Sequence, residues 1–257
     1  MNEAVALAGL ALLGLVIGSF LNVCIHRIPR RESIVSPGSQ CPQCQYPLRW
    51  YDNIPVLSYV LLGARCRRCR ARIPARYPAV ELVTLAVFVA HYLVIGLDIT
   101  LVPRLLFACT LIVLFAIDLE HHLLPDAVTL PGIVTGLAFS LLLPPGIVSA
   151  LLGVLVGGGV LWLIGEAYYR YAGQEGMGGG DVKMLAMVGA FLGWKLVIVT
   201  LVFSSVAGSL IGMLVLATRR GGLKYALPYG TFLALGALVA SLFGERIVAW
   251  YVGLYQL

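Results

Sequence analysis

The chain has 257 residues, of which 60% are hydrophobic and 12% are charged, and its formal net charge is +6. A soluble globular domain carries about 25% charged residues and about 45–50% apolar ones, so this chain has more apolar side chains than a soluble fold of its length can bury. The composition excludes a soluble enzyme, a disordered chain, a secreted disulfide-stabilised domain and a cytosolic nucleic-acid-binding protein. It predicts an all-α polytopic membrane protein.

The first apolar run covers residues 4–25, and a helix needs about 20 apolar residues to cross the hydrocarbon core. Its positive charges follow the run instead of preceding it, which argues against a cleaved signal peptide and for a membrane helix with its N-terminus outside. Ten of the eighteen basic residues then lie between Arg27 and Arg76. Because Lys and Arg mark the cytoplasmic side of a span, we predict that residues 28–77 form a cytoplasmic loop that faces anionic lipid head groups.

Two C-x-x-C pairs lie in this loop, Cys41-Pro-Gln-Cys44 and Cys66-Arg-Arg-Cys69. Two thiolates of one tight turn can reach one metal ion, and two such turns complete a tetrahedral four-sulfur shell. In a reducing cytoplasm, clustered thiols indicate a metal in preference to disulfides, and a redox C-x-x-C would need only one pair. We therefore predict one structural zinc ion, for which the segment 50–55, beginning with Trp50, would supply a small apolar filling. Cys24 and Cys109 lie in apolar runs and are expected to be buried hydrophobic side chains.

Seven further apolar runs follow the loop. They cover residues 79–97, 101–117, 127–143, 147–169, 182–194, 196–217 and 230–251. With the first run they predict about eight transmembrane helices, of which the sixth is unusually short. If these runs cross the membrane in alternate directions, fifteen of the eighteen basic residues lie on one side, in the loops on the side of residues 28–77 together with Arg27 just before that loop. This asymmetry supports eight spans with both termini outside. The predicted domains are a first transmembrane helix over residues 1–27, the four-cysteine zinc loop over 28–77 and a seven-helix transmembrane domain over 78–257.

Two aspartates lie at the ends of predicted spans. Asp118 ends the run 101–117, and Asp181 follows three glycines and opens the short run 182–194. Ionisable residues at membrane depth are energetically costly and are therefore candidates for function. Two neighbouring carboxylates cannot both ionise easily, so such a pair could activate water with one group and protonate a carbonyl oxygen with the other.

Simpler roles for these acidic residues stay open at this point. Asp181 could be the N-cap of the following helix, with the glycines as a linker, and Asp118 could be an interfacial residue that faces water. Asp126 follows Leu124-Pro125 and is best explained as a helix N-cap. The other charged residues near span ends are compatible with salt bridges or with a polar cavity; they are Glu81, Glu120, Glu166, Glu175 and Lys183.

Five segments occur in a fixed order along nearly the whole chain. They are Gly18-Ser19-Phe20-Leu21-Asn22-Val23 with His26-Arg27 and Pro29; the four-cysteine loop; Ala116-Ile117-Asp118 with Leu124-Pro125-Asp126; Gly176-Met177-Gly178-Gly179-Gly180-Asp181-Val182-Lys183-Met184; and Pro228-Tyr229-Gly230-Thr231-Phe232-Leu233-Ala234. Together they resemble the bacterial type IV prepilin peptidase family, the leader peptidases and N-methyltransferases of pilus and type II secretion systems. Thr231 is a minor departure, since proline is expected there.

The resemblance implies a GxGD-type aspartyl protease in which Asp118 and Asp181 are the catalytic pair and Gly178, Gly180 and Lys183 support the loop. The substrate would be a prepilin or pseudopilin, with a short basic leader that ends in glycine and precedes an apolar helix. Cleavage would take place at the cytoplasmic face of the bacterial inner membrane. The resemblance also implies methylation of the new N-terminal residue, with S-adenosylmethionine as the methyl donor.

No residue of the chain independently indicates a methyl-donor site, and the sequence contains no Rossmann-like methyltransferase domain. We expect this role to fall to the N-terminal signature and the zinc loop. The candidate residues of the signature are Gly18, Asn22, His26 and Arg27.

Three other functions stay open from the residues alone. A presenilin-like protease would cut inside a span, and a transporter would use the aspartates as ion ligands. A zinc-bearing scaffold of a secretion complex would depend on the cysteines and not on the aspartates. Nothing in the sequence indicates nucleic-acid binding or an oligomeric state.

Overall fold

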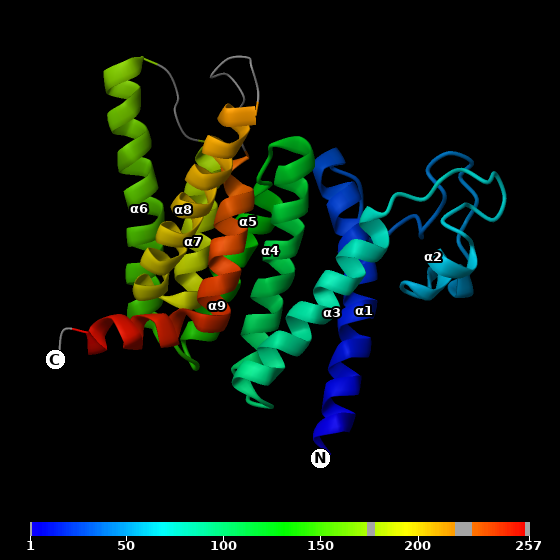
Figure 1. Ribbon diagram of the computed structural model, residues 1–257, viewed down its shortest axis with the longest axis horizontal. Helices are drawn as coiled ribbons and strands as arrows, with labels where there is room; N and C mark the ends of the chain where they lie inside the picture. Colours follow the sequence, from blue (N-terminus) through cyan, green and yellow to red (C-terminus); the bar gives the residue numbers. More distant parts are fainter. Residues whose placement is uncertain (1, 174–177, 219–227, 255–257) are drawn as a thin grey trace. The chain divides into compact units, whose positions relative to one another are not determined.

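The computed structural model describes residues 2–173, 178–218 and 228–254, and the chain divides into two compact units, Met1–Leu101 and Val102–Leu257. In the part of the chain that is described, every regular element is a helix, and the only β-structure consists of two isolated bridges. The all-α class is therefore confirmed (Figure 1). A membrane chain has this form because a helix satisfies its backbone hydrogen bonds within one segment.

The first unit is built on two long helices, α1 (Glu3–Arg27) and α3 (Arg76–Ile95). They pack closely because glycines of α1 face the backbone of α3: a Cβ on Gly14 would lie 2.7 Å from Leu85 Cα, and one on Gly18 would lie 2.7 Å from Glu81 Cα. Small residues at such crossings allow the close approach that stabilises helix pairs in membranes. The loop between these helices carries only short helices, η1 (Ile28–Arg30), η2 (Trp50–Asn53) and α2 (Leu57–Leu61).

The second unit is a bundle centred on one short helix. Its elements are α4 (Leu101–His121), α5 (Asp126–Ser140), α6 (Ile147–Ala172), α7 (Gly179–Leu192), α8 (Trp194–Thr218) and α9 (Tyr229–Gly253). Helix α7 packs against α5, α6, α8 and α9, and every residue from Met184 to Leu192 is buried. The ring of Phe191 also stacks on that of Phe107 of α4, with 4.9 Å between the centroids.

Glycines bring α6 and α7 into backbone contact. A Cβ on Gly153 of α6 would lie 2.5 Å from the carbonyl oxygen of Gly189 on α7, and one on Gly157 would lie 2.5 Å from that of Leu185. Real Cβ atoms do not approach other atoms so closely, so both positions require glycine in this packing. The four-residue spacing of Gly153 and Gly157 places both on one helix face.

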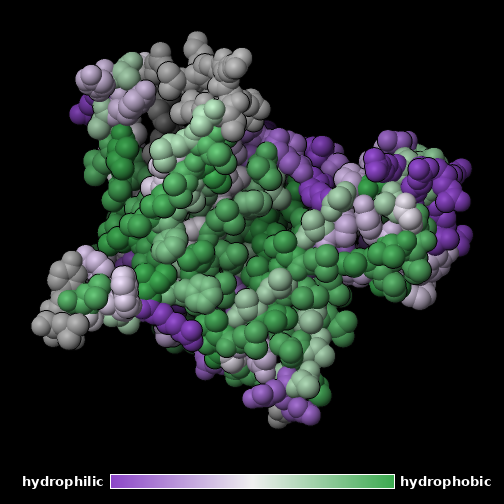
Figure 2. All heavy atoms as spheres, viewed as in Figure 1, coloured by the Kyte–Doolittle hydropathy of each residue, from purple (hydrophilic) through white to green (hydrophobic). Residues whose placement is uncertain are grey.

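The structure contains a helix at each of the eight predicted apolar runs, and six of these helices are long and apolar enough to cross a membrane. Helices α5 and α7 have 15 and 14 residues, fewer than the roughly 20 that a span requires. Helix α7 is covered by its neighbours, so its short length leaves no lipid-exposed backbone. Apolar side chains cover the outward faces of the long helices, and hydrophilic ones gather on the loop of residues 28–77 (Figure 2).

Candidate active site and metal centre

Asp118 lies in the last turn of α4 and is 5% exposed. Its Oδ2 accepts a hydrogen bond of 2.7 Å from the backbone N–H of Thr231, in the first turn of α9. The approach depends on Gly230, where a Cβ would lie 2.8 Å from the same oxygen. The end of α4 and the start of α9 therefore meet at this carboxylate.

Asp181 lies in the first turn of α7. The helix begins after Gly178, which is its N-cap residue, so the alternative that Asp181 is the N-cap is wrong. A Cβ on Gly180 would lie 2.8 Å from Leu124 Cβ, and one on Gly230 would lie 2.9 Å from Leu124 Cδ1. Leu124, in the turn after α4, thus touches the starts of both α7 and α9.

The structure brings Asp118 and Asp181 into one site, and the charge of Asp118 acts on Asp181. They come from different helices, 63 positions apart in the sequence, and no periodicity relates them. An adjacent pair of this kind can hold one carboxylate ionised and the other protonated, which is the arrangement that general base and general acid catalysis requires.

Lys183 forms an ion pair next to this site. Its Nζ lies 2.7 Å and 2.8 Å from the two carboxylate oxygens of Asp126, and the pair joins the first turns of α7 and α5. The prediction that Asp126 is an N-cap is wrong, because the N-cap residue of α5 is Pro125 and Asp126 is the first helical residue. The pair spans 57 positions, so no local sequence signal could reveal it.

The four loop cysteines form a cluster with the dimensions of a zinc site. All four Sγ atoms lie within 4.8 Å of one another, with 3.8 Å between those of Cys41 and Cys69 and 3.9 Å between those of Cys44 and Cys66. A tetrahedral shell with Zn–S bonds of about 2.3 Å places its sulfurs about 3.8 Å apart. The prediction that the two pairs converge is confirmed, and the donor set fits zinc.

The two C-x-x-C turns repeat one local structure. In the first, the Cys41 N–H donates to Tyr46 at 3.0 Å, and the Gln45 N–H donates back to Cys41 at 2.8 Å. The second turn, which begins at Cys66, makes the same two bonds with Arg70 in the place of Gln45. Both of these residues adopt a left-handed conformation, with φ of 54° and 60°. The turns thus direct each cysteine pair to one side.

Backbone N–H groups favour the metal-binding form of one of the four sulfurs. Hydrogen bonds from the backbone of Cys69 and Arg68 lower the pKa of the Cys66 thiol to about 6. The thiolate is the form that binds metals, so these two N–H groups favour the metal-binding form of Cys66.

Trp50, the first residue of the segment 50–55, does not contribute to the predicted apolar filling, whereas Tyr51, Ile54 and Pro55 are half-buried. Trp50 is 80% exposed, whereas the Asp52 side chain is 1% exposed and accepts two bonds from the Arg67 guanidinium, at 2.9 Å and 2.7 Å. The guanidinium neutralises the carboxylate, which is the condition for burying it. This ion pair ties η2 to the second C-x-x-C turn, and the Tyr51 ring adds to it because the Arg67 guanidinium lies over the ring, 5.3 Å from its centroid.

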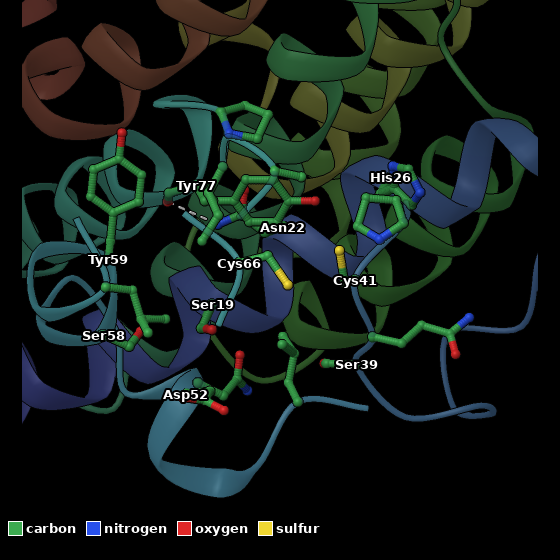
Figure 3. A pocket seen from close by; sticks show the side chains of 18 of the residues that line it. Ser19, Asn22, His26, Ser39, Cys41, Asp52, Ser58, Tyr59, Cys66 and Tyr77 are labelled. Atoms are coloured by element: carbon green, nitrogen blue, oxygen red, sulfur yellow. Dashed lines mark hydrogen bonds between the residues drawn. The ribbon is translucent and has the colours of Figure 1, made fainter. Parts of the chain in front are cut away.

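A cavity of about 310 Å³ lies within the first unit, between α1, the cysteine loop and the start of α3 (Figure 3). Two buried oxygens among its lining residues have no hydrogen-bond partner, Asn22 Oδ1 and Asp52 Oδ2. Glu81 also lines the cavity, and its Oε2 accepts the N–H of Val56 at 2.7 Å. The rings of Tyr59 and Tyr77 belong to the same cavity. It is therefore mainly apolar, with a few acceptor oxygens.

The residues suggested for methyl transfer all lie at or near this cavity. Asn22, His26 and Arg27 line it, and the Asn22 amide is held by a 3.0 Å bond to the carbonyl of Tyr77. Arg27 donates to the carbonyls of Ser33, Pro37 and Gly38 and so fixes the start of the loop. Gly18 packs on the backbone of α3. The sequence does not predict that Glu81 lines this cavity, nor that Asp52 is buried in an ion pair beside it.

Comparison with known proteins gives a consistent family. Residues 12–95 match the bacterial peptidase A24 N-terminal domain, and residues 105–213 match the type IV leader peptidase family. Curated relatives named prepilin leader peptidase/N-methyltransferase include one from Aeromonas salmonicida, 39% identical over 94% of this chain and 92% of its own length. The relative from Pseudomonas aeruginosa is 36% identical over 94% of this chain and 91% of its own length. The relative from Myxococcus xanthus is 43% identical over 83% of this chain and 64% of its own length. No solved structure matches. The chain belongs to the type IV leader peptidase family.

Proposed function

We propose that the protein is a membrane-embedded aspartyl endopeptidase that removes the leader of type IV prepilins or pseudopilins and then methylates the new N-terminal residue. The observation that carries the peptidase is the meeting of Asp118 and Asp181 at the ends of two helices, in a chain whose family comprises leader peptidases. The relatives' names support both activities.

In the proposed cleavage, one aspartate takes a proton from water as the water oxygen bonds to the scissile carbonyl carbon. The other aspartate gives its proton to the carbonyl oxygen, and the intermediate collapses when the C–N bond breaks and the amine takes up a proton. Gly178 supports this role because it leaves backbone without a side chain beside Asp181, where an extended peptide needs room, and Gly180 supports it because it lets the start of α7 pack against Leu124. The Lys183–Asp126 ion pair would hold the start of α7 in place.

The proposed location is the bacterial inner membrane, with the active site facing the cytoplasm and both termini in the periplasm. Its support is the charge asymmetry, since fifteen of the eighteen basic residues, Arg27 at the end of the first span included, lie on the side of the membrane assigned to the cytoplasm. A prepilin substrate crosses the same membrane with its apolar helix, which would bring the scissile bond to that face.

The peptidase assignment is tested with Asp118→Asn and Asp181→Asn in membranes supplied with a prepilin. Each variant should lose at least about a thousandfold in cleavage rate, because the amide can neither take up nor supply the proton. Asp98→Asn is the matched control, since Asp98 is an exposed aspartate of the loop between α3 and α4. Cleavage at the wild-type rate by either active-site variant would refute the assignment, and a cut inside the apolar helix would indicate a presenilin-like protease.

The cavity of the first unit is the proposed methyl-donor site. When bound, S-adenosylmethionine supplies a methyl group activated by a positively charged sulfur. The unpartnered oxygens of Asn22 and Asp52 suit its amino and hydroxyl groups, and Tyr59 and Tyr77 offer apolar surface for its adenine. Glu81 is the buried carboxylate that would hold the ammonium of the new pilin N-terminus and take up its proton. Cys41 and Cys66 also line the cavity, so one zinc ion would shape it by fixing the loop.

Methyl transfer is tested separately from cleavage with Asn22→Ala and Glu81→Gln. Both variants should lose methyl transfer from labelled S-adenosylmethionine and still cleave prepilin, because the aspartates lie in the other unit. Glu32→Gln, an exposed acidic residue of the same loop, is the control and should keep both activities. Equilibrium dialysis with the labelled donor should show weaker binding to Asn22→Ala. Normal methyl transfer by both cavity variants would exclude this cavity as the site.

A further inference from the structure

The loop of residues 28–77 contains one segment that differs in character from the rest. Residues 53–64 carry no charged side chain, whereas five arginines lie in the eight residues that follow. The segment holds the short helix α2. An apolar stretch of about 10–14 residues is too short to span a membrane and is typical of a buried or an interfacial segment. The direction of its side chains decides between the two.

Helix α2 turns its apolar side chains outward. Leu57, Val60 and Leu61 are 50%, 66% and 75% exposed, and their spacing of three and four residues places them on one face. The opposite face meets the cavity of the first unit with Ser58 and Tyr59. A helix on a water-soluble surface has the reverse arrangement, with its apolar stripe facing inward. The outward face of α2 therefore suits an apolar surrounding.

Trp50 lies on a neighbouring element. It belongs to η2, which packs against α2, and it is 80% exposed. Tryptophan is enriched where a membrane meets water, because its ring is apolar and its N–H is polar. We call Trp50, Leu57, Val60 and Leu61 the apolar patch of the loop.

The start of α2 lies well inside the Arg27 end of α1. The N–H of Val56, immediately before α2, donates to Glu81 Oε2 at 2.7 Å. Glu81 is level with Gly18 of α1, since a Cβ on Gly18 would lie 2.7 Å from Glu81 Cα. From Gly18 to Arg27, the last residue of α1, the helix rises by about 13 Å. Figure 1 shows the same arrangement, because the loop turns back from the end of α1 and α2 is drawn lower than both that end and the start of α3.

At this level α1 presents an apolar surface. Val16 and Phe20, on either side of Gly18 in the sequence, are 59% and 47% exposed, and on a membrane-spanning helix such side chains face hydrocarbon. The loop reaches them, because Pro55 lines a second cavity, of about 350 Å³, together with Val16 and Phe20. The apolar patch continues two residues after Pro55, at Leu57, and so extends a surface that faces lipid.

The arginines after α2 suit the same position. All five in residues 65–72 are exposed. Figure 2 shows hydrophilic residues along the upper and outer edge of the loop and hydrophobic ones on the side of α2. Arginine side chains can reach lipid phosphates while their apolar stems lie against hydrocarbon, and a basic segment beside an apolar face binds anionic lipid.

We propose that the apolar patch of the loop is embedded in the membrane leaflet that surrounds the Arg27 end of α1, and that the arginines of residues 65–72 bind the phosphates of anionic lipids above it. Part of the loop is thus an interfacial segment and does not stand in water. Ser58 and Tyr59 lie on the other face of α2, so the bilayer holds one wall of the cavity in place. The inference does not depend on cleavage or methyl transfer.

Photo-crosslinking in vesicles of phosphatidylethanolamine with a minority of phosphatidylglycerol tests the lipid contact. A diazirine amino acid replaces Leu61 in the full chain, and mass spectrometry identifies the group that it captures on illumination. Lipid adducts are expected, as they are at position 12, since Leu12 of α1 is 64% exposed. Position 32 is the matched control and should capture almost no lipid, because Glu32 is exposed but lies beyond α1, where its N–H donates to the Arg27 carbonyl. Adducts at position 61 only with water, with a second copy of the chain or with added prepilin would overturn the proposal.

The arginines predict which lipid is captured. Phosphatidylglycerol should make up at least about twice its share of the bilayer among the adducts at position 61, because basic residues near the surface attract anionic lipid. The double variant Arg65→Gln, Arg68→Gln should bring this fraction closer to the bilayer share and keep the lipid adducts as such. Adducts that match the bilayer composition in the wild-type loop would overturn the role given to the arginines.

A second measurement leaves the apolar patch unchanged. In the triple variant Trp162→Phe, Trp194→Phe, Trp250→Phe, Trp50 is the only tryptophan of the chain. Lipids brominated on their acyl chains should quench its emission more strongly than acrylamide, which stays in water. Adding Val60→Asp and Leu61→Asp should reverse this order, because charged side chains are costly in hydrocarbon. Stronger quenching by acrylamide with the patch unchanged would overturn the proposal even if no adduct were recovered.

Discussion

At the scale of single residues, charge pairs and backbone amides decide which polar side chains are buried. Asp52 is buried because Arg67 neutralises it, and Asp118 is buried because the Thr231 N–H meets it. The sequence does not indicate the hydrogen-bond partners of these two aspartates, because the partners lie 15 and 113 positions away along the chain. Local hydrophobicity predicts that Trp50 is buried in the loop, but Asp52 is buried instead and Trp50 is exposed.

Arg67→Ala should loosen the zinc loop. The change leaves the Asp52 carboxylate buried without its donors, which destabilises the folded loop. Zinc should then pass to a chelator roughly tenfold faster, because a less stable loop releases its metal more readily. The readout is the rate of zinc transfer to a metal-binding dye.

Arg68→Ala is the control, since Arg68 is the neighbouring arginine of the same C-x-x-C turn and rests over the Tyr46 ring, 5.9 Å from its centroid. Equal zinc release from both variants would mean that the ion pair does not stabilise the loop.

At the scale of helices, the sequence predicts where the elements lie but not which of them is central. Each of the eight apolar runs becomes a helix, because hydrocarbon leaves the backbone no other way to satisfy its hydrogen bonds. The sixth run looks like an unusually short span in the sequence. In the structure it is the buried centre of the second unit, α7, and its first turn carries Asp181.

The α6–α7 crossing should be intolerant of side chains. Gly153→Ala should lower the stability by about 1–3 kcal/mol, because the added Cβ would lie 2.5 Å from the Gly189 carbonyl oxygen and the two backbones would have to separate. Cleavage should fall as well, since α7 positions Asp181. The measurement is the midpoint of thermal unfolding in detergent.

The control for this crossing lies on the same helix. A Cβ on Gly159 of α6 would meet nothing within 4 Å, so Gly159→Ala should be neutral or slightly stabilising. Equal losses in both variants would show that helix propensity, and not the crossing, controls stability.

At the scale of the whole molecule, the candidate chemistry is divided between the two units. The cysteine cluster and the cavity lie in Met1–Leu101, and Asp118 and Asp181 lie in Val102–Leu257. The two family matches divide the chain in nearly the same place, at residues 12–95 and 105–213. We therefore expect that loss of the proposed methyl transfer leaves the proposed cleavage intact, and the reverse.

Removal of zinc tests this division. A strong chelator, or serine at Cys41 and Cys66, should abolish methyl transfer and leave most of the prepilin cleavage, because the cavity depends on the cysteine loop and the aspartates do not. Cys109→Ser serves as the control for loss of a cysteine outside the loop. Parallel loss of cleavage and methyl transfer would show that the zinc loop is needed for the fold as a whole.

The sequence by itself determines the membrane class, the positions of the helices and the two C-x-x-C turns of this protein. These features are local, because an apolar run and a pair of cysteines with two residues between them each dictate their own geometry. Only the tertiary structure decides that Asp118 meets the amide of Thr231, that Lys183 pairs with Asp126, and that Asn22 and Glu81 line one cavity. These contacts join segments that are far apart in the chain. They form because glycines let helices approach closely and because buried charges need partners. Neither of these two requirements produces a periodic pattern in the sequence.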